Sequence, residues 1–189
     1  MAEGRLDNPL WRFALAHYRR RGVAVACLAL QDGAGIDVNL LMFALWHGAS
    51  GRGRLGGTAL SRLVRAVAAW QSNVVTPLRD LRRRLKPLTD DPALGLLMRP
   101  ISGLRSDVKR LELEAERVEL AMLYAMARPK IRSAVDTPTR NRAARQNVAR
   151  YLDIAVGTLD RRLVRESRIF IDALATPKRL KRKSDSKSR

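Results

Sequence analysis

Residues 28–48, LALQDGAGIDVNLLMFALWHG, combine two strongly apolar segments with a compact polar group between them. The polar group consists of Gln31, Asp32, Asp37 and Asn39. The second apolar segment, VNLLMFALW, is hydrophobic nearly all round a helix, which predicts a buried helix at the centre of the fold. A buried carboxylate or amide without a partner costs about 1 to 3 kcal/mol, so the polar group must be hydrogen-bonded, solvated or used on a ligand.

Two interpretations of this polar group follow. In the first, Asp37 caps the central helix, Asn39 lies in its first turn, and Gln31 and Asp32 satisfy backbone groups at the end of the preceding helix. In the second, the four residues form a small-ligand or enzymatic site beside Trp46, in which repulsion between Asp32 and Asp37 raises one pKa. The sequence favours the first interpretation, because every residue has a local structural role.

Helical patterns continue on both sides and predict an all-α fold. Cap and first-turn pairs mark three helix starts, at Asn8–Pro9, Thr76–Pro77 and Thr137–Pro138. One short helix is expected over residues 23–31, with Gly33 and Gly35 turning the chain after it, and the prolines within residues 88–102 predict an irregular segment there.

The predicted architecture is a single helical bundle of about six to eight helices with a long helical hairpin. It divides into a helical domain over residues 1–128, a C-terminal helical extension packed on it over residues 129–176, and a disordered basic tail over residues 177–189.

The longest predicted helix carries a coiled-coil pattern. Its apolar residues follow alternating spacings of four and three over three heptads, at Leu104, Val108, Leu111, Ala115, Val118, Met122 and Ala125. The acidic residues Glu112, Glu114, Glu116 and Glu119 are expected to lie off this seam and to pair with arginines. The seam packs either against the arginine-rich helix that precedes it, as an intramolecular hairpin, or against a second copy, as a homodimer through residues 104–125.

The chain is strongly basic, with 37 Lys and Arg against 18 Asp and Glu and a net charge of +19. Residues 177–189 hold seven basic residues and one acid, so the rest of the chain still carries +13. This charge favours a polyanionic partner, either nucleic acid bound without sequence specificity or an acidic protein. The residues predicted to form the polyanion surface are Arg79, Arg82, Arg83, Arg84 and Lys86 in one helix and Lys178, Arg179, Lys181, Arg182 and Lys183 in the tail.

Other chemistry finds little support in the sequence. His17 and His47 lie 30 positions apart, and no cluster has metal-ligand spacing, so neither a metal site nor a catalytic residue is predicted. Residues 48–57, GASGRGRLGG, match a dinucleotide-loop pattern without the strand that should precede it, which favours a mobile linker and no cofactor. The lone Cys27 excludes an internal disulfide. A non-enzymatic interaction module is therefore the favoured function.

The cellular compartment is expected to be the cytoplasm. The segment MAEGRLDNPLW lacks the basic and apolar regions of a secretory signal. No stretch reaches the roughly 18 uninterrupted apolar residues that a membrane span requires.

Four segments together resemble a known family. They are NPLWRFALAHY over residues 8–18, ACLALQDGAGIDVNLLMFALW over residues 26–46, the Trp70 to Leu85 segment and the glutamate-rich helix. These segments resemble the DUF2390 family of uncharacterised bacterial proteins over roughly residues 6–128, most specifically from Leu30 to Trp46. The resemblance implies a soluble helical protein and brings no activity or ligand; the chain from about Arg128 onward has no counterpart in it.

Overall fold

The computed structural model describes residues 6–127 and 135–175, and this part of the chain is helical with no strand. The predicted all-α class is therefore confirmed, while the predicted tail over residues 177–189 lies outside the described residues. The α-helices are α2 (Pro9–Tyr18), α3 (Val23–Ala34), α4 (Val38–His47), α5 (Gly57–Trp70), α6 (Thr76–Leu88), α7 (Met98–Ala125), α8 (Thr137–Val156) and α9 (Arg161–Asp172). Shorter π-helical turns are η1 (Gly48–Arg52) and η2 (Gln71–Val75), and 3-10 turns are η3 (Pro92–Leu97) and η4 (Ala173–Ala175).

Helix α4 forms the centre of the core, as its composition predicts. Every residue from Asn39 to His47 is buried, and α2, α3, α7 and α8 all contact this helix. Asp37 caps α4, because its Oδ1 accepts hydrogen bonds from the amides of Asn39 (2.8 Å) and Leu40 (3.2 Å). Helix α3 extends further than expected, to Ala34, so Gly33 is helical and only Gly35, with φ of 62°, turns the chain.

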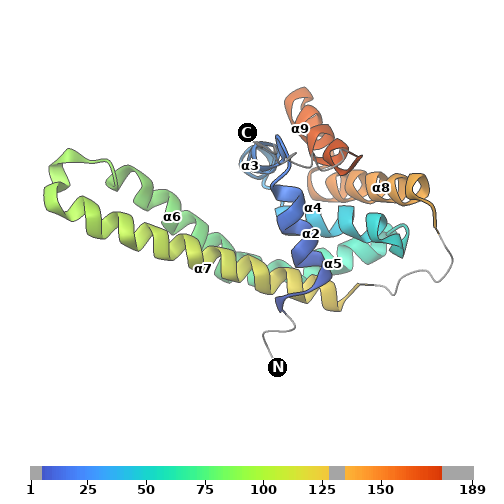
Figure 1. The fold of residues 1–189 in the computed structure, drawn as a ribbon, viewed down its shortest axis with the longest axis horizontal. Helices are drawn as coiled ribbons and strands as arrows, with labels where there is room; N and C mark the ends of the chain where they lie inside the picture. The colour runs from blue at the N-terminus through green and yellow to red at the C-terminus, as the bar shows by residue number, and fades with distance from the viewer. Residues whose placement is uncertain (1–5, 128–134, 176–189) are drawn as a thin grey trace, which may run out of the picture.

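Helices α6 and α7 form a long hairpin, here called the arm, which projects from the other helices, here called the body (Figure 1). The chain is continuously helical from Gly57 to Leu88 through α5, η2 and α6, and α7 returns antiparallel along α6. Helix α6 begins at Thr76 with Pro77 in its first turn, as predicted, but Thr76 has helical backbone angles and does not cap the helix, because η2 leads directly into it. The wider π turn η2 ends at Val75, two residues before Pro77, which has no amide hydrogen to donate to the preceding turn.

The irregular segment predicted over residues 88–102 is also shorter than expected. Helix α7 begins at Met98 and includes Pro100 in its first turn. Proline is tolerated there because the first amides of a helix have no partner within the helix. The tip of the arm is therefore confined to residues 89–97, which include the 3-10 turn η3.

The heptad positions of α7 divide between two environments. Val108 and Ala115 are buried in the hairpin, whereas Leu104 and Leu111 are exposed. Glu112 and Glu119 are buried, against the expectation that they lie off the seam. The reason is that the inner face of α7 is turned toward polar partners on α4 and α6.

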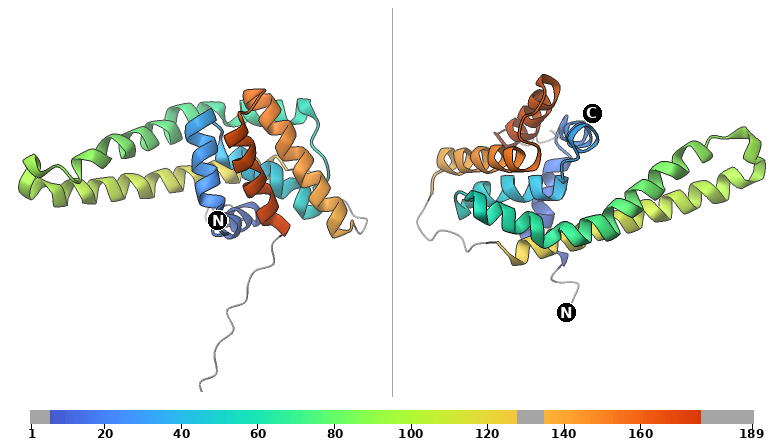
Figure 2. Two further views of the ribbon diagram at one scale, coloured as in Figure 1. Left: turned by 90° about the horizontal axis from the view of Figure 1, so that it is seen from above. Right: turned by 180° about the vertical axis from the view of Figure 1, so that it is seen from behind.

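The C-terminal helices pack on the rest of the body from another side. Helix α8 contacts α4 and η1, and α9 lies next to α3 (Figure 2). A Cβ placed on Gly48 would lie 2.2 Å from the backbone nitrogen of Ala144, so glycine permits the close approach of α8. The expected mobile linker over residues 48–57 is in fact held in place, because Asn147 of α8 accepts from the Leu55 amide (2.8 Å) and donates to the Gly53 carbonyl (3.1 Å).

Candidate functional site

The polar residues of the opening segment meet partners on the arm. With its amide oriented to suit its neighbours, Gln31 accepts hydrogen bonds from both terminal nitrogens of Arg79 (3.1 and 3.2 Å). Asp32 forms an ion pair with Arg83, and Asn39 Nδ2 donates to Glu119 Oε2 (2.9 Å). The ends of α3 and α4 are thereby joined to α6 and α7.

An ionic network lies at the root of the arm. Arg79 Nε donates to Glu112 Oε1 (3.0 Å), and Arg79 Nη2 donates to Glu116 Oε1 (2.7 Å). Arg82 also binds Glu112. Burial opposes ionisation of Glu112, but the hydrogen bonds and charges of Arg82 and Arg79 lower its pKa. The network fixes α6 against α7 through charged groups rather than through a continuous apolar seam.

A second buried group joins Asp37 to Glu119. Burial, followed by the charge of Asp37 and a hydrogen bond to it, raises the pKa of Glu119 far above its ordinary value. Two carboxyl groups can share a hydrogen bond only when one of them holds a proton, and burial favours the protonated form of Glu119. Tyr151 of α8 completes the group: its hydroxyl accepts from the Asp37 amide (3.1 Å) and donates to the Asp37 carbonyl (3.2 Å).

Trp46, the fifth residue of the predicted site, lies elsewhere. It is seven residues beyond Asn39 on α4, or about 10 Å along the helix axis. Its ring packs against Phe43 and Tyr124, and the Arg52 guanidinium lies 4.1 Å from the ring centroid. A cavity of about 490 Å³ opens beside Trp46, lined by Pro9, Phe13, Ala49, Ser50, Thr137, Asn141 and Leu174. The structure therefore does not bring the five residues into one site.

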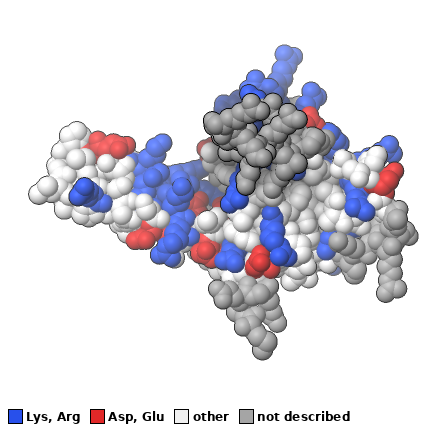
Figure 3. Space-filling view, in the orientation of Figure 1, with Lys and Arg blue, Asp and Glu red and all other residues white. Residues whose placement is uncertain are grey.

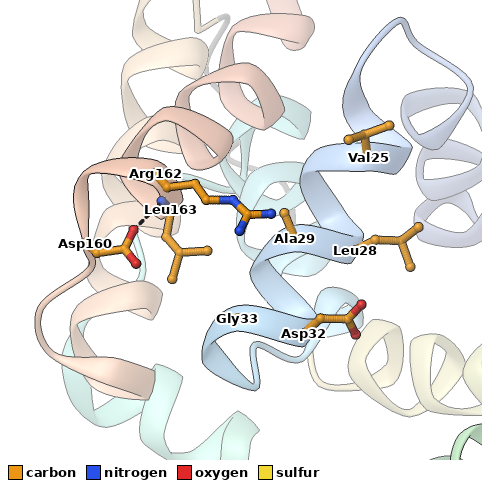
Figure 4. Close-up of a pocket in the computed structure, with 8 residues that line it drawn as sticks. All are labelled: Val25, Leu28, Ala29, Asp32, Gly33, Asp160, Arg162 and Leu163. Atoms are coloured by element: carbon orange, nitrogen blue, oxygen red, sulfur yellow. Dashed lines mark hydrogen bonds between the residues drawn. The ribbon is translucent and has the colours of Figure 1, made fainter.

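Asp32, a member of the polar group, borders a groove. This groove of about 410 Å³ lies between α3 and α9, and its lining includes the apolar residues Val25 and Leu28. In Figure 4, Arg162 extends from α9 toward α3, while the Asp32 carboxylate points away from α9. Asp160, at the other edge, is occupied as the cap of α9, accepting from the Leu163 amide (2.8 Å).

Residues 9–123 match the model of a family described as a protein of unknown function, DUF2390. The chain belongs to the DUF2390 family. The match confirms the resemblance, and the DUF2390 segment spans α2 to nearly the end of α7, including the polar group and the arm. Helices α8 and α9 lie beyond it. No protein of curated function and no solved structure matches the chain.

The predicted polyanion surface is only partly on the outside of the DUF2390 arm. Arg79 is buried and Arg82 is half-buried, and both are bound to Glu112, so neither faces a partner. Arg83 is exposed but paired with Asp32. Arg84 and Lys86 are exposed and have no ion pair in the described part of the chain. The tail residues Lys178, Arg179, Lys181, Arg182 and Lys183 lie outside the described residues.

Helix α9 presents further cations that sequence reasoning did not assign to this surface. Arg161, Arg162, Arg165 and Arg168 are all exposed on this helix. The spacing from Arg161 to Arg165 to Arg168 places these three on one face. That spacing is visible in the sequence, but only the packing of α9 on α3 decides that this face points outward. Figure 3 shows Lys and Arg gathered along the middle of the arm and at the top of the molecule.

Three further observations concern other chemistry. Among residues 6–127 and 135–175, no group of three His, Cys, Asp or Glu side chains is arranged to hold a metal ion. In the same residues, no helix has both the length and the apolar character needed to cross a membrane. Cys27 is buried, and burial raises the pKa of its thiol to about 12, which keeps it in the unreactive thiol form.

Proposed function

We propose that this protein is a non-enzymatic interaction module that binds the phosphate backbone of nucleic acid through α9 and the basic tail that follows it. The observation that carries the proposal is the outward face of α9. Arg161 and Arg168 are exposed on that face, Arg162 is exposed at its side toward α3, and none of the three has an acidic partner among the described residues. Only Arg165 touches an acid, Glu166, at 3.3 Å.

Helix α9 is firmly seated, so its arginines are presented on a fixed surface. Leu163 and Phe170 are buried on its inner side. The Phe170 carbonyl accepts a hydrogen bond from His17 Nε2 (2.9 Å), which joins α9 to α2. Cations on a rigid element lose less conformational freedom on binding than cations on a flexible loop. A row of them therefore suits an extended polyanion.

The chemistry of these residues favours phosphate. Guanidinium groups bind phosphate oxygens in a planar, two-pronged geometry, and each contact releases counterions from the nucleic acid. The exposed face of α9 carries no aromatic side chain on which a base could stack. Residues 177–189 add seven basic residues shortly after η4. Phosphate contacts of this kind position a nucleic acid without reading its sequence.

The alternative, a small-ligand or enzymatic site at Gln31, Asp32, Asp37 and Asn39, has less support. Each of these side chains is bonded to a protein partner: Gln31 to Arg79, Asp32 to Arg83, Asp37 to its own helix, and Asn39 to Glu119. Groups engaged in this way have a sufficient structural role without a ligand.

The test is the salt dependence of binding to labelled duplex DNA and RNA of random sequence. The full chain should bind both at low salt, with affinity falling steeply as salt rises. Replacing Arg161, Arg162 and Arg168 together by Gln should reduce the slope of log affinity against log salt by about 2 to 3, because each phosphate contact on duplex DNA contributes about 0.9.

A matched control replaces Arg54, Arg62 and Arg65 by Gln. These three are exposed on a different part of the chain, around α5, and the change in net charge is identical. The control should bind nearly as the parent does. Equal losses in both variants would show that overall charge rather than α9 drives binding. Absence of binding at low salt, or binding to polyglutamate instead, would overturn the proposal, and the latter would indicate an acidic protein partner.

A further inference from the structure

The arm exposes a line of leucines on each of its helices. Leu81 and Leu88 on α6 are 38% and 39% exposed, and Leu104 and Leu111 on α7 are 52% and 47% exposed. Each pair is separated by seven residues, so its members lie above one another on a helix. Leu97, 58% exposed at the start of α7, continues the same spacing.

The four leucines share one face of the arm. The contacts of Arg79 with Glu112 and Glu116 fix the antiparallel register, which places Leu81 level with Leu111 and Leu88 level with Leu104. The edge of the hairpin that carries Arg79 and Glu112 is turned toward α3. On both helices, the helical spacing puts the leucines on the opposite edge, and we call this surface the leucine face.

We propose that the leucine face binds the leucine face of a second copy of this chain, so that two arms form a four-helix bundle. A contiguous apolar stripe with a heptad period is the surface that helical bundles bury. A two-fold pairing is self-complementary, because each copy contributes the same leucines to the interface. The tail is a poor alternative occupant, since residues 177–189 contain Leu180 as their one large apolar residue among seven basic ones.

The charges along the rims of the leucine face favour a second copy of the chain as its partner, and they favour one orientation of that copy. The α6 rim carries exposed Arg84. The α7 rim carries exposed Asp107 and Glu114, which form ion pairs of 3.6 Å within α7, to Arg110 and Arg117. The register places Arg84 and Asp107 within about one turn of each other along the arm. If α6 of each copy lies along α7 of its partner, opposite charges meet on both sides. Pairing α6 with α6 would instead bring the two Arg84 side chains together.

The test is the mass of the full chain in solution, measured by light scattering and sedimentation over a wide range of concentration after nucleic acid is removed. The parent should have twice the mass of one chain, falling to one chain only on dilution. The variant with Leu104→Gln and Leu111→Gln should remain monomeric. Both leucines are half exposed, so circular dichroism should show unchanged helicity.

Two further variants distinguish this interface from others. Leu113→Gln is a matched control, because Leu113 is 46% exposed on the opposite face of α7, and it should dimerise as the parent does. Arg84→Glu should weaken the dimer at least tenfold, and adding Asp107→Lys should restore it. If the parent is monomeric, or if its dimer is insensitive to the leucine changes, the proposal is overturned and a different protein becomes the candidate partner of the leucine face. A dimer that Arg84→Glu does not weaken overturns the proposed orientation.

Discussion

The carboxyl groups of Asp37 and Glu119 lie close enough to share a hydrogen bond where α4 begins against α7, and Asp37 Oδ2 and Glu119 Oε1 are both buried with no other hydrogen-bond partner among the described residues. Both residues are acids, so the bond requires a proton that Glu119 keeps because it is buried. Asn39 donates to the other Glu119 oxygen at 2.9 Å, and Tyr151 binds the backbone of Asp37. One protonated carboxyl group therefore joins the central helix to the arm, and Tyr151 brings α8 to the same point.

Glu119→Gln should remove a pH dependence of stability. Glu119 loses its proton near pH 4.5 in the unfolded chain but keeps it to a much higher pH when folded. Its stabilising contribution is complete below the unfolded pKa and declines by about 1.4 kcal/mol per pH unit up to the folded pKa. A Gln amide can still donate to Asp37 and accept from Asn39. In urea unfolding, the unfolding free energy of the Gln variant should be similar to that of the parent near pH 5 and should exceed it increasingly toward pH 8. If the unfolding free energies of the two proteins changed in parallel with pH, the proton shared by Asp37 and Glu119 would be contradicted.

His17 should produce the opposite dependence. It is buried against Phe13 and Phe170, and burial lowers its pKa from 6.5 to about 4. His17 takes up a proton below pH 6.5 in the unfolded chain but not in the folded chain. The contribution of neutral His17 to the unfolding free energy is therefore complete above pH 6.5 and is lost as pH falls toward 4. The shift corresponds to about 3 kcal/mol over that window. In His17→Gln, the unfolding free energy measured in urea should fall less between pH 6.5 and pH 4 than in the parent. An unchanged fall would show that groups other than His17 cause the loss of stability at acid pH.

Two arginines on α6 should differ sharply in their contribution to stability. Arg79→Ala leaves Glu116 without its ion-pair partner and buried Glu112 with Arg82 alone, which should cost about 3 kcal/mol of unfolding free energy. Arg83→Ala removes an ion pair in which both side chains are about half exposed, and should cost less than about 1 kcal/mol. Urea unfolding of the two variants at neutral pH measures the difference. If both variants lost similar amounts of unfolding free energy, the ionic network around Arg79 and Glu112 would not be what fixes α6 against α7.

The features that the sequence predicts well are local ones. Asp37 is recognisable as a cap because the amides that it binds lie two and three residues later, and α4 is recognisable as central from its own composition. The arm follows from two long amphipathic segments joined by a proline-containing break. Each of these inferences needs only neighbouring residues.

The candidate site was predicted less well because its contacts are distant in the chain. Arg79 and Glu112 are 33 residues apart, and a periodic pattern assigns both to the solvent side because they are charged. Only their mutual pairing, together with Gln31, offsets the cost of burying them. Trp46 shares a helix with Asn39, yet their separation along the axis places them in different surroundings. For α9, the arginine spacing was readable, but its outward direction depends on packing against α3.

Gly48 tests how α8 is attached to the other helices, and Gly103 provides a contrasting helical position. Gly48→Ala would place a Cβ 2.2 Å from the Ala144 backbone nitrogen, so α8 must move away, and the expected loss is about 2 to 3 kcal/mol or more. A Cβ added at Gly103, inside α7, would meet no heavy atom within 4 Å, so Gly103→Ala should stabilise the chain by about 0.5 to 1 kcal/mol. Urea unfolding of both variants should therefore give shifts of opposite sign. If Gly48→Ala instead unfolds with the parent, α8 does not cross η1 at close range, and the bonds from Asn147 to Leu55 and Gly53 could not form as described.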